Sequence, residues 1–329
     1  MKKSPEGFFT RTLALEDADE VASLISACAL SGGAEANTTA EEVRDDWQDT
    51  DLAEEAVAVV ASDGRIAGYA DLINRSYVAI SVYGYVHPDL RGQGIGAYLA
   101  AWGEDWTRER IPLAPENARV SVQYYINAPN TGARSLLEGF GYRPVRSTYV
   151  MEIRLQDAPP APEWPEGITV RIIVPDRDER ALFEAVEDAF RDVWNRPRGT
   201  FERFAGLTRT EVFDPALWFL AMDGGEIAGM ALGKVIFGEG WVDVVGVRRP
   251  WRSRGLGLAM LRHAFAEYHW RGVEKVGLSV DAGSVTGAPR LYSRAGMHVA
   301  SEYVVYQKEL RPGVDLGERS GSLSNTEDG

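Results

Sequence analysis

The chain repeats one pattern of residues in its two halves. Three pairs of landmarks are each 161 positions apart, namely Ile66 and Ile227, Val86 and Val247, and Arg91 and Arg252. Residues 59–68 and 219–229 both show the strand, turn and strand pattern of a β-hairpin. Because a repeat of this kind decides the fold, it indicates a duplicated domain. The length of 329 residues also suits two domains of about 150 residues each.

Prolines mark the boundary between the two copies. The segment 156–167 contains four of them, Pro159, Pro160, Pro162 and Pro165. The fixed φ and the missing N–H of proline disfavour both helix and sheet. We therefore predict an N-terminal domain over 1–155, a semi-rigid linker over 156–167 and a C-terminal domain over 168–311. Residues 312–329 are polar and rich in Gly and Ser, which predicts a disordered tail.

Each copy is expected to be a mixed α/β unit. The predicted order of elements is helix, strands, glycine-rich loop, helix, strand, helix and strand. Apolar residues recur at helical spacing over 95–106 and 258–268. Residues 120–124 and 276–280 have the apolar pattern of buried strands, and a short helix ending at a glycine follows each. The predicted fold class is α/β, with a mixed sheet flanked by helices in each of two tandem domains.

Composition and charge disfavour several classes of function. The 49 acidic and 35 basic residues give a formal charge of −14, which repels a phosphate backbone and argues against nucleic acid as a partner. The same field favours a cationic substrate such as an amine. Lys2 and Lys3 precede no apolar stretch long enough for a signal peptide or membrane span, so we expect a cytoplasmic protein without a membrane partner.

Cysteine and histidine give no sign of a metal centre. Cys28 is the only cysteine, which rules out an internal disulfide and fits a reducing compartment. The four histidines are scattered without the spacing of metal ligands, so no metal site is predicted. No feature of the sequence specifies an oligomeric state.

A glycine-rich turn connects a strand to a helix in each copy. Loop 1 runs from Val86 to Gly96 and includes Arg91, Gly92, Gln93, Gly94 and Ile95; loop 2 runs from Val247 to Gly257 and includes Arg252, Ser253, Arg254, Gly255 and Leu256. Glycine allows tight turns and close approach to a ligand, while the amides and dipole at a helix start favour an anion. No Gly-Lys-Ser/Thr follows, and the order differs from Gly-x-Gly-x-x-Gly, which disfavours nucleotide hydrolysis and hydride transfer. Both loops therefore predict a pyrophosphate site.

This arrangement resembles the GNAT superfamily of N-acetyltransferases. The resemblance rests on a strand, the pattern Val-x-x-x-x-Arg-x-x-Gly-x-Gly, a helix, and a later strand and helix ending in a glycine corner, and it covers nearly the whole chain in two copies. It implies acetyl-CoA as cosubstrate, with its pyrophosphate on the amides of loops 1 and 2. It also implies that the preceding strand parts from its neighbour and that an amide near its end polarises the thioester carbonyl.

Tyr292 is the candidate general acid. Alignment of the copies at Gly141 and Gly296 places Tyr292 where the first copy has Leu137. This tyrosine position is similar to that of the family's general acid, and a phenol can protonate a departing thiolate whereas leucine cannot. We therefore predict that the second copy is catalytic and that the first only binds. A core tyrosine on an amphipathic helix is the structural alternative.

Asp243 is the candidate general base. It lies on the strand before loop 2, and a period of two places it on one face with Trp241, Val245 and Val247. From there it would accept the proton of an amine directly or through water, and the first copy is expected to have Tyr83 at the equivalent position. A plain carboxylate at a strand edge is the alternative interpretation.

The acceptor pocket is expected in the variable region before the second hairpin. Residues 183–214 combine acidic and aromatic side chains, namely Glu187, Asp188, Phe190, Asp192, Trp194 and Phe201. This mixture suits a cationic organic amine, and an amphipathic helix explains it equally well. Asn127 and Asn130 resemble the family's coenzyme-facing asparagine, whereas the second copy has Ser284 and Thr286 there.

The predicted function is acetyl transfer from acetyl-CoA to the primary amine of a small molecule, directly in a ternary complex. The alternative from another class is a non-catalytic acyl-CoA-binding sensor or scaffold. Among enzymes, the tandem arrangement is similar to that of the mycothiol synthase family, and an antibiotic-modifying enzyme or a protein N-acetyltransferase fits the loops equally well.

Overall fold

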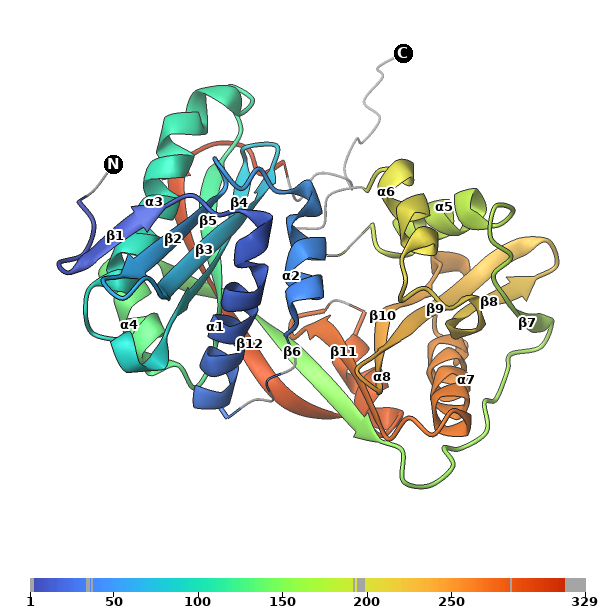
Figure 1. Ribbon diagram of the computed structural model, residues 1–329. Coiled ribbons are helices and arrows are strands. Elements are labelled where there is room, and N and C mark those ends of the chain that lie inside the picture. The colour runs from blue at the N-terminus through green and yellow to red at the C-terminus, as the bar shows by residue number, and fades with distance from the viewer. Residues whose placement is uncertain are drawn as a thin grey trace, which may run out of the picture. The chain divides into compact units, whose positions relative to one another are not determined.

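The computed structural model describes residues 3–33, 36, 38–191, 193, 199–284 and 286–316. The chain forms two compact units. Unit 1 comprises Met1–Arg146 and Tyr303–Leu316, and unit 2 contains Ser147–Glu302. Figure 1 shows the elements of both units in chain order.

Unit 1 is built on a mixed sheet with the strand order β1-β2-β3-β4-β5-β12. These strands are β1 (Phe8–Arg11), β2 (Ala56–Ala61), β3 (Ile66–Arg75), β4 (Ala79–Val86), β5 (Val120–Asn127) and β12 (His298–Arg311). Only the β4–β5 pair is parallel. Helices α1 (Ala18–Ser31) and α2 (Ala40–Asp46) cover one face, and α3 (Ile95–Arg110) and α4 (Thr131–Gly139) cover the other.

Unit 2 repeats this plan with the strand order β7-β8-β9-β10-β11-β6. These strands are β6 (Arg143–Arg154), β7 (Ile168–Ile172), β8 (Trp218–Asp223), β9 (Glu226–Ile236), β10 (Glu239–Val247) and β11 (Lys275–Asp281). The parallel pair is β10–β11. Helices α5 (Glu179–Ala189) and α6 (Phe201–Gly206) lie on one face, and α7 (Leu256–Trp270) and α8 (Ala288–Arg294) on the other.

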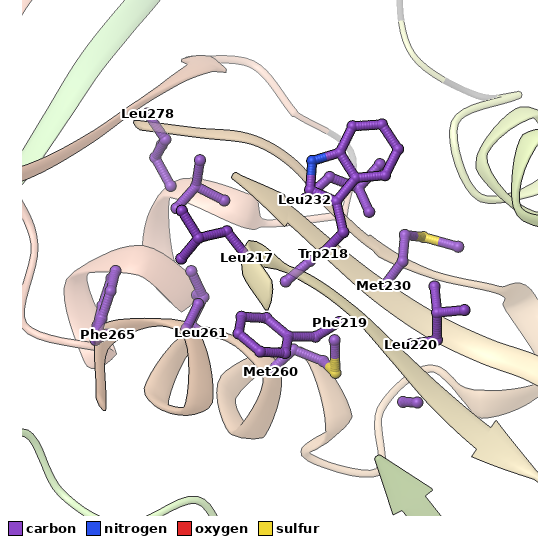
Figure 2. Packing of buried hydrophobic residues seen from close by; sticks show 14 of the residues in the cluster. Leu217, Trp218, Phe219, Leu220, Met230, Leu232, Met260, Leu261, Phe265 and Leu278 are labelled. Atoms are coloured by element: carbon purple, nitrogen blue, oxygen red, sulfur yellow. The ribbon is translucent and has the colours of Figure 1, made fainter. Parts of the chain in front are cut away.

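Helices on both faces explain why the inner strands have continuous apolar runs. In β8 every residue from Trp218 to Met222 is buried. Phe219 points toward Met260 of α7, whereas Trp218 points away from that helix (Figure 2). A strand that is covered on both faces needs apolar side chains at consecutive positions, not at alternate ones. Strand β8 therefore contributes side chains to the core on both faces of the sheet.

The final strand of each repeat lies in the unit of the other repeat. Residues Tyr303–Arg311 of β12 pair with β5, and residues Thr148–Arg154 of β6 pair with β11, both antiparallel. The units thus differ from the continuous ranges 1–155 and 168–311 that the sequence predicts. Hydrophobic pattern identifies each final strand, but β5 and β11 offer equivalent edges, so the pattern does not specify which edge is used.

The predicted linker has neither helix nor strand, as its prolines indicate. It belongs to unit 2, where the Trp164 ring lies 5.5 Å from the His263 ring of α7. The tail prediction is wrong for its first residues, because the Val314 amide donates to the Asn117 carbonyl at 2.7 Å and the Arg119 amide donates to the Val314 carbonyl at 2.8 Å. Residues 317–329 lie outside the described residues.

The remaining predicted elements are confirmed, with one omission. The hairpins, the loop-to-helix turns, the strands after them and the short helices all form. Each unit also begins with a strand, β1 or β7, that was not predicted before the first helix. Their edge position and short length leave little apolar signal. Among the described residues, no helix has the length and apolar character needed to cross a bilayer.

Strand β12 places a half-buried cation beside a buried carboxylate in unit 1. Lys308 Nζ donates to Glu104 Oε1 at 2.7 Å and to the Phe140 carbonyl at 2.7 Å. Only 10% of the Glu104 side chain is exposed. Arg108 also contacts this carboxylate, at the longer distance of 3.5 Å. Lys308 is therefore the main neutralising partner of a buried charge.

We predict that Lys308→Ala destabilises unit 1 by about 3 kcal/mol, because it leaves the Glu104 carboxylate buried without its main partner. Urea unfolding followed by circular dichroism measures the change. The double variant Lys308→Met with Glu104→Gln should recover most of the loss, since it removes both charges. Arg44→Ala, which breaks the exposed pair with Asp19, is the matched control and should leave the midpoint nearly unchanged. Equal effects of Lys308→Ala and Arg44→Ala would contradict the assignment.

Candidate active site

Loops 1 and 2 follow the same backbone path into their helices. Gly92 and Ser253 have φ values of 79° and 60°, and Gly94 and Gly255 have 83° and 86°. Two left-handed positions in three residues turn the chain sharply from strand to helix, which favours glycine. Ser253 adopts the first of these conformations without being glycine. The repeat predicted from spacing is thus confirmed at the level of backbone angles.

Several backbone amides without an intrahelical acceptor lie together where each loop enters its helix. Ile95 and Leu256 are the first residues of α3 and α7. Bonding to the loop begins only with the Tyr98 amide, which donates to the Gly94 carbonyl at 3.0 Å, and with the Leu258 amide, which donates to the Gly255 carbonyl at 3.1 Å. The earlier amides have no intrahelical acceptor, and the positive end of the helix dipole lies beside them. Both loops therefore suit the pyrophosphate of acetyl-CoA, which would be bound there as cosubstrate.

The last glycine of each loop allows two helices to pack closely. A Cβ atom at Gly96 would lie 3.1 Å from Leu136 Cδ2 of α4, and one at Gly257 would lie 3.0 Å from Leu291 Cδ2 of α8. Both distances are shorter than an ordinary van der Waals contact. Gly96 and Gly257 thus have a packing role besides the predicted cofactor role.

One arginine of each loop forms a hydrogen bond with a helix of its own unit, Arg91 with α1 and Arg252 with α5. Arg252 Nε donates to the Val247 carbonyl at 3.0 Å, and its Nη2 donates to the Ala189 carbonyl of α5 at 2.8 Å. Arg91 Nη1 donates to Ser31 Oγ, the last residue of α1, at 3.0 Å. These guanidinium groups hold the loop in place, and the predicted contact with the cosubstrate would come from the loop amides.

The two loops differ in charge. Loop 2 has four arginines and no acidic residue, whereas loop 1 has Arg91 offset by Asp89. Asp188 and Glu226 neutralise part of this charge through Arg248, at 3.0 and 3.3 Å. Arg254 is exposed, like its counterpart Gln93. Loop 2 therefore attracts an anion more strongly than loop 1 in a chain that is acidic overall.

The parallel strands part before each loop. The β4–β5 ladder ends at Val82–Tyr124, although β4 continues to Val86. The β10–β11 ladder ends at Trp241–Gly277, although β10 continues to Val247. Backbone groups beyond these points have no partner in the neighbouring parallel strand. This is the gap that the family resemblance implies.

A β-bulge at Asp243 distinguishes unit 2. Val242 lies opposite Gly233 and Val244 lies opposite Leu232, so Asp243 is an extra residue without an opposite partner in β9. The β3–β4 ladder has no such shift, and Tyr83 lies opposite Asp71. Asp71 and Leu232 are equivalent because they are 161 positions apart. Their ladder partners, Tyr83 and Val244, are therefore equivalent as well. The predicted equivalence of Tyr83 and Asp243 is therefore wrong.

The bulge also corrects the predicted face of β10. A Cβ atom at Gly240 would meet Tyr268 of α7, whereas one at Gly246 would meet Phe190 at the end of α5. Even-numbered residues thus change faces at the bulge. Val247 lies against Gly257 on the α7 side. Trp241 lies on the opposite face, so the predicted face that joins Trp241 with Val245 and Val247 is wrong.

Asp243 is paired with a lysine. Lys234 Nζ of β9 lies 3.2 Å from Asp243 Oδ1, and 42% of the aspartate side chain is exposed. Although it is accessible, burial by the surrounding protein raises the pKa of Asp243, and Lys234 opposes that rise. A carboxylate of raised pKa that solvent can reach is suited to accepting a proton, but the role of base stays a prediction.

Tyr292 occupies the position predicted from the alignment. It lies on α8 and is 7% exposed, and its counterpart Leu137 on α4 is 3% exposed. The carbonyls of both residues accept a hydrogen bond at 3.0 Å, from the Met297 and Tyr142 amides respectively. Burial raises the pKa of Tyr292 to about 12. Its hydroxyl is therefore protonated at neutral pH and makes no hydrogen bond within the described part of the chain, and its role as acid stays a prediction.

Two of the candidate acceptor residues have structural contacts in unit 2. Asp188 forms the ion pair with Arg248 described above, and Phe201 packs edge-on against Phe183 at 5.9 Å. Asp192 and Trp194 lie outside the described residues. In unit 1, Asn130 Oδ1 accepts from the Ala133 amide at 3.1 Å and caps α4, which gives this asparagine a structural role.

Sequence reasoning missed a polar cluster on the α1 side of the unit 1 sheet. In this cluster Asp71 lies beside three tyrosines. Unit 2 has only apolar residues at the equivalent positions, which are 161 residues later in the sequence. The equivalent pairs are Tyr69 and Met230, Asp71 and Leu232, Tyr83 and Val244, and Tyr85 and Gly246. Comparison of the repeats at this offset could have found it, because a buried acid replaces a leucine.

These features define a class of protein. Each unit has a sheet whose central parallel strands part in front of a glycine-rich anion loop at a helix start. That combination is typical of enzymes that use an acyl-coenzyme A thioester. A family model described as the acetyltransferase (GNAT) family matches residues 19–142 and 180–297. The chain therefore belongs to the GNAT family of N-acetyltransferases and contains two GNAT domains in tandem.

Individual relatives agree with this assignment. The chain is 32% identical over 230 residues to a mycothiol acetyltransferase of Thermobispora bispora, covering 68% of this chain and 74% of the relative. A crystal structure of a GCN5-related N-acetyltransferase from Sphaerobacter thermophilus is 54% identical with a TM-score of 0.85, covering 96% and 99% of the two chains. A tandem GNAT protein from the clavulanic acid biosynthesis pathway, 17% identical with a TM-score of 0.67 over 93% and 100%, shares the fold.

We predict that loop 2 binds acetyl-CoA more tightly than loop 1. Calorimetric titration should show a strong site that Gly255→Trp removes and a weaker site that Gly94→Trp removes, because each bulky side chain is strained at positive φ and fills the path of the ligand. Raising the salt concentration should weaken the strong site more, since it depends more on arginine charge. Gly64→Trp, at a hairpin turn with positive φ and open space, is the control. A strong site that survives Gly255→Trp would contradict the assignment.

Proposed function

We propose that unit 2 transfers the acetyl group of acetyl-CoA to the primary amine of a small molecule, and that unit 1 is a non-catalytic domain of the same fold. The observation that carries this proposal is the Tyr292 phenol on α8, which makes no hydrogen bond within the described part of the chain and stands where unit 1 has Leu137. A phenol at this position can donate a proton whereas leucine cannot, which favours a chemical role. It also favours an enzyme over the alternative of a non-catalytic acyl-CoA sensor or scaffold.

The proposed reaction proceeds in a ternary complex without a covalent enzyme intermediate. Amides of loop 2 hold the pyrophosphate, and the thioester extends into the gap between β10 and β11. The amine nitrogen attacks the carbonyl carbon, a C–N bond forms and the C–S bond breaks. The nitrogen loses its proton to Asp243, and the departing thiolate takes a proton from Tyr292. The chain thus supplies an acceptor, Asp243, for the proton that the neutral amine loses as it becomes an amide, and a donor, Tyr292, for the proton that the thiolate takes up.

The charge of this chain and the names of its relatives indicate which class of acceptor amine to test first. A formal charge of −14 attracts cationic amines. The relatives named mycothiol acetyltransferase make the amine acetylated by those enzymes the first acceptor to test. Thiol release from acetyl-CoA in the presence of that amine tests the proposed reaction directly.

We predict that Tyr292→Phe lowers kcat about 100-fold while the Kd for acetyl-CoA changes little, because only the proton donor to the thiolate is lost. Steady-state thiol release and calorimetry measure the two quantities. Tyr142→Phe is the control, since it removes a tyrosine hydroxyl that is buried and without a partner in the described structure but lies in unit 1. Equal turnover of Tyr292→Phe and Tyr142→Phe would remove Tyr292 from the mechanism.

We predict that turnover falls as pH decreases through the raised pKa of Asp243, because only the carboxylate form accepts a proton. Asp243→Asn should lose most of its activity, and the activity that remains should no longer fall at low pH. This fall at low pH is the acid limb of the profile. Lys234→Met removes the cation that lowers the pKa of Asp243, so its acid limb should move to higher pH. The pH dependence of kcat/KM for the three proteins measures this. An acid limb that is unchanged in Asp243→Asn would assign the base elsewhere.

A further inference from the structure

We propose that unit 1 contains a separate binding site for a small organic cation with a primary ammonium group, formed by Asp71 and the tyrosines around the gap between β4 and β5. The site is distinct from the acceptor site of unit 2. Because unit 1 has Leu137 in place of the acid, the ligand is bound there and not acetylated. Its binding is therefore independent of the proposed transfer reaction.

The first observation is a buried carboxylate oxygen without a partner. Asp71 Oδ2 accepts a hydrogen bond from the Tyr69 hydroxyl, and Trp47 Nε1 donates to that same hydroxyl at 2.8 Å. Asp71 Oδ1 is buried and has no hydrogen-bond partner in the described part of the chain. A buried acceptor left unpaired is costly, and an ammonium N–H would satisfy it with charge assistance.

The second observation is where this carboxylate lies. Tyr83 is opposite Asp71 in the β3–β4 ladder, so the two side chains share a face. Tyr83 and Tyr125 are the first residues beyond the end of the β4–β5 ladder, and their rings stack 5.8 Å apart with planes 3° from parallel. Both rings are partly exposed. Asp71 thus lies next to the open end of the gap.

The third observation is the group of aromatic rings around Asp71. Tyr85 stacks on Tyr69 at 6.2 Å, and Trp47 lies 6.0 Å from Tyr69. Faces of tyrosine rings attract cations, and a neighbouring carboxylate strengthens that attraction. Unit 2 shows that the fold does not need this cluster, because Met230, Leu232 and Val244 fill the corresponding positions with apolar side chains. The polar residues of unit 1 are therefore explained better by a ligand than by packing.

The charge state of Asp71 supports binding near neutral pH. Burial raises the pKa of Asp71 to about 6, the Asp46 carboxylate also raises it, and the Tyr69 hydrogen bond lowers it. Tyr69, Tyr83 and Tyr85 face the carboxylate from β3 and β4, and burial raises the pKa of Tyr69 and Tyr85. The site is thus anionic above about pH 6 and loses its charge below it.

The test uses n-butylammonium as the cation and n-butanol as its neutral counterpart, with the whole protein at pH 8 and saturation-transfer NMR titrations. We expect n-butylammonium to bind at least tenfold more tightly than n-butanol. Asp71→Asn, and Asp71→Leu with the residue found in unit 2, should abolish that preference. At pH 5 the wild-type preference should decrease, whereas Asp71→Asn should show no dependence on pH.

Asp243→Asn separates this site from the acceptor site of unit 2. Cation binding that persists in Asp243→Asn and disappears in both Asp71 variants supports the proposal, whatever the outcome for acetyl transfer. Binding that is lost in Asp243→Asn and kept in the Asp71 variants overturns it. Cooperative thermal unfolding shows that each variant is folded, and a stabilised Asp71→Leu with unchanged cation preference would show that the cluster is only a core feature.

Discussion

The parting of two parallel strands is the constraint on which the rest of each unit depends. Once the β10–β11 ladder ends at Trp241–Gly277, backbone groups beyond it lose their neighbours in the parallel strand, and the chain must still turn from β10 into α7. The left-handed conformations of Ser253 and Gly255 make that turn and direct the first amides of the helix outward. The gap and the anion site thus arise from one local event, and unit 1 repeats it at Val82–Tyr124.

The exchange of final strands links the stability of the units to chain connectivity. Unit 1 needs β12 for its last ladder and for Lys308, which pairs with Glu104 inside that unit. Unit 2 likewise needs the end of β6, where Thr148–Arg154 pair with β11. Contacts between β5 and β12 join residues more than 170 positions apart, so forming them carries the loop-closure cost of more than half the chain. This entropy cost favours forming the local contacts of each repeat before its final strand pairs.

Much of the fold was predictable from the sequence because duplication supplies an internal comparison. The spacing of 161 residues located both loops. Alignment at Gly141 and Gly296 correctly identified Tyr292 as the equivalent of Leu137 in the other repeat. Period-two alternation failed at Asp243, since a bulge inserts one residue and no propensity marks it. The partner of each final strand was equally inaccessible, because β5 and β11 have similar apolar edges. Asp71 lies outside the loops, and its replacement of Leu232 becomes apparent only when the sheet faces of the two repeats are compared.

The bulge is the smallest difference between the units and has the largest consequence. One added residue in β10 reverses the faces on either side of it, so Gly246 turns toward α5 while Val247 packs against Gly257. It leaves Asp243 without a ladder partner at the place where β10 has already parted from β11. Unit 1 has a regular ladder there, and its acid, Asp71, lies one strand away and is held by Tyr69. In unit 2 the bulge thus leaves an accessible carboxylate, paired with Lys234, where β10 has parted from β11, whereas in unit 1 one oxygen of Asp71 is buried beside tyrosines. This difference agrees with the proposed chemistry in unit 2 and the proposed binding in unit 1.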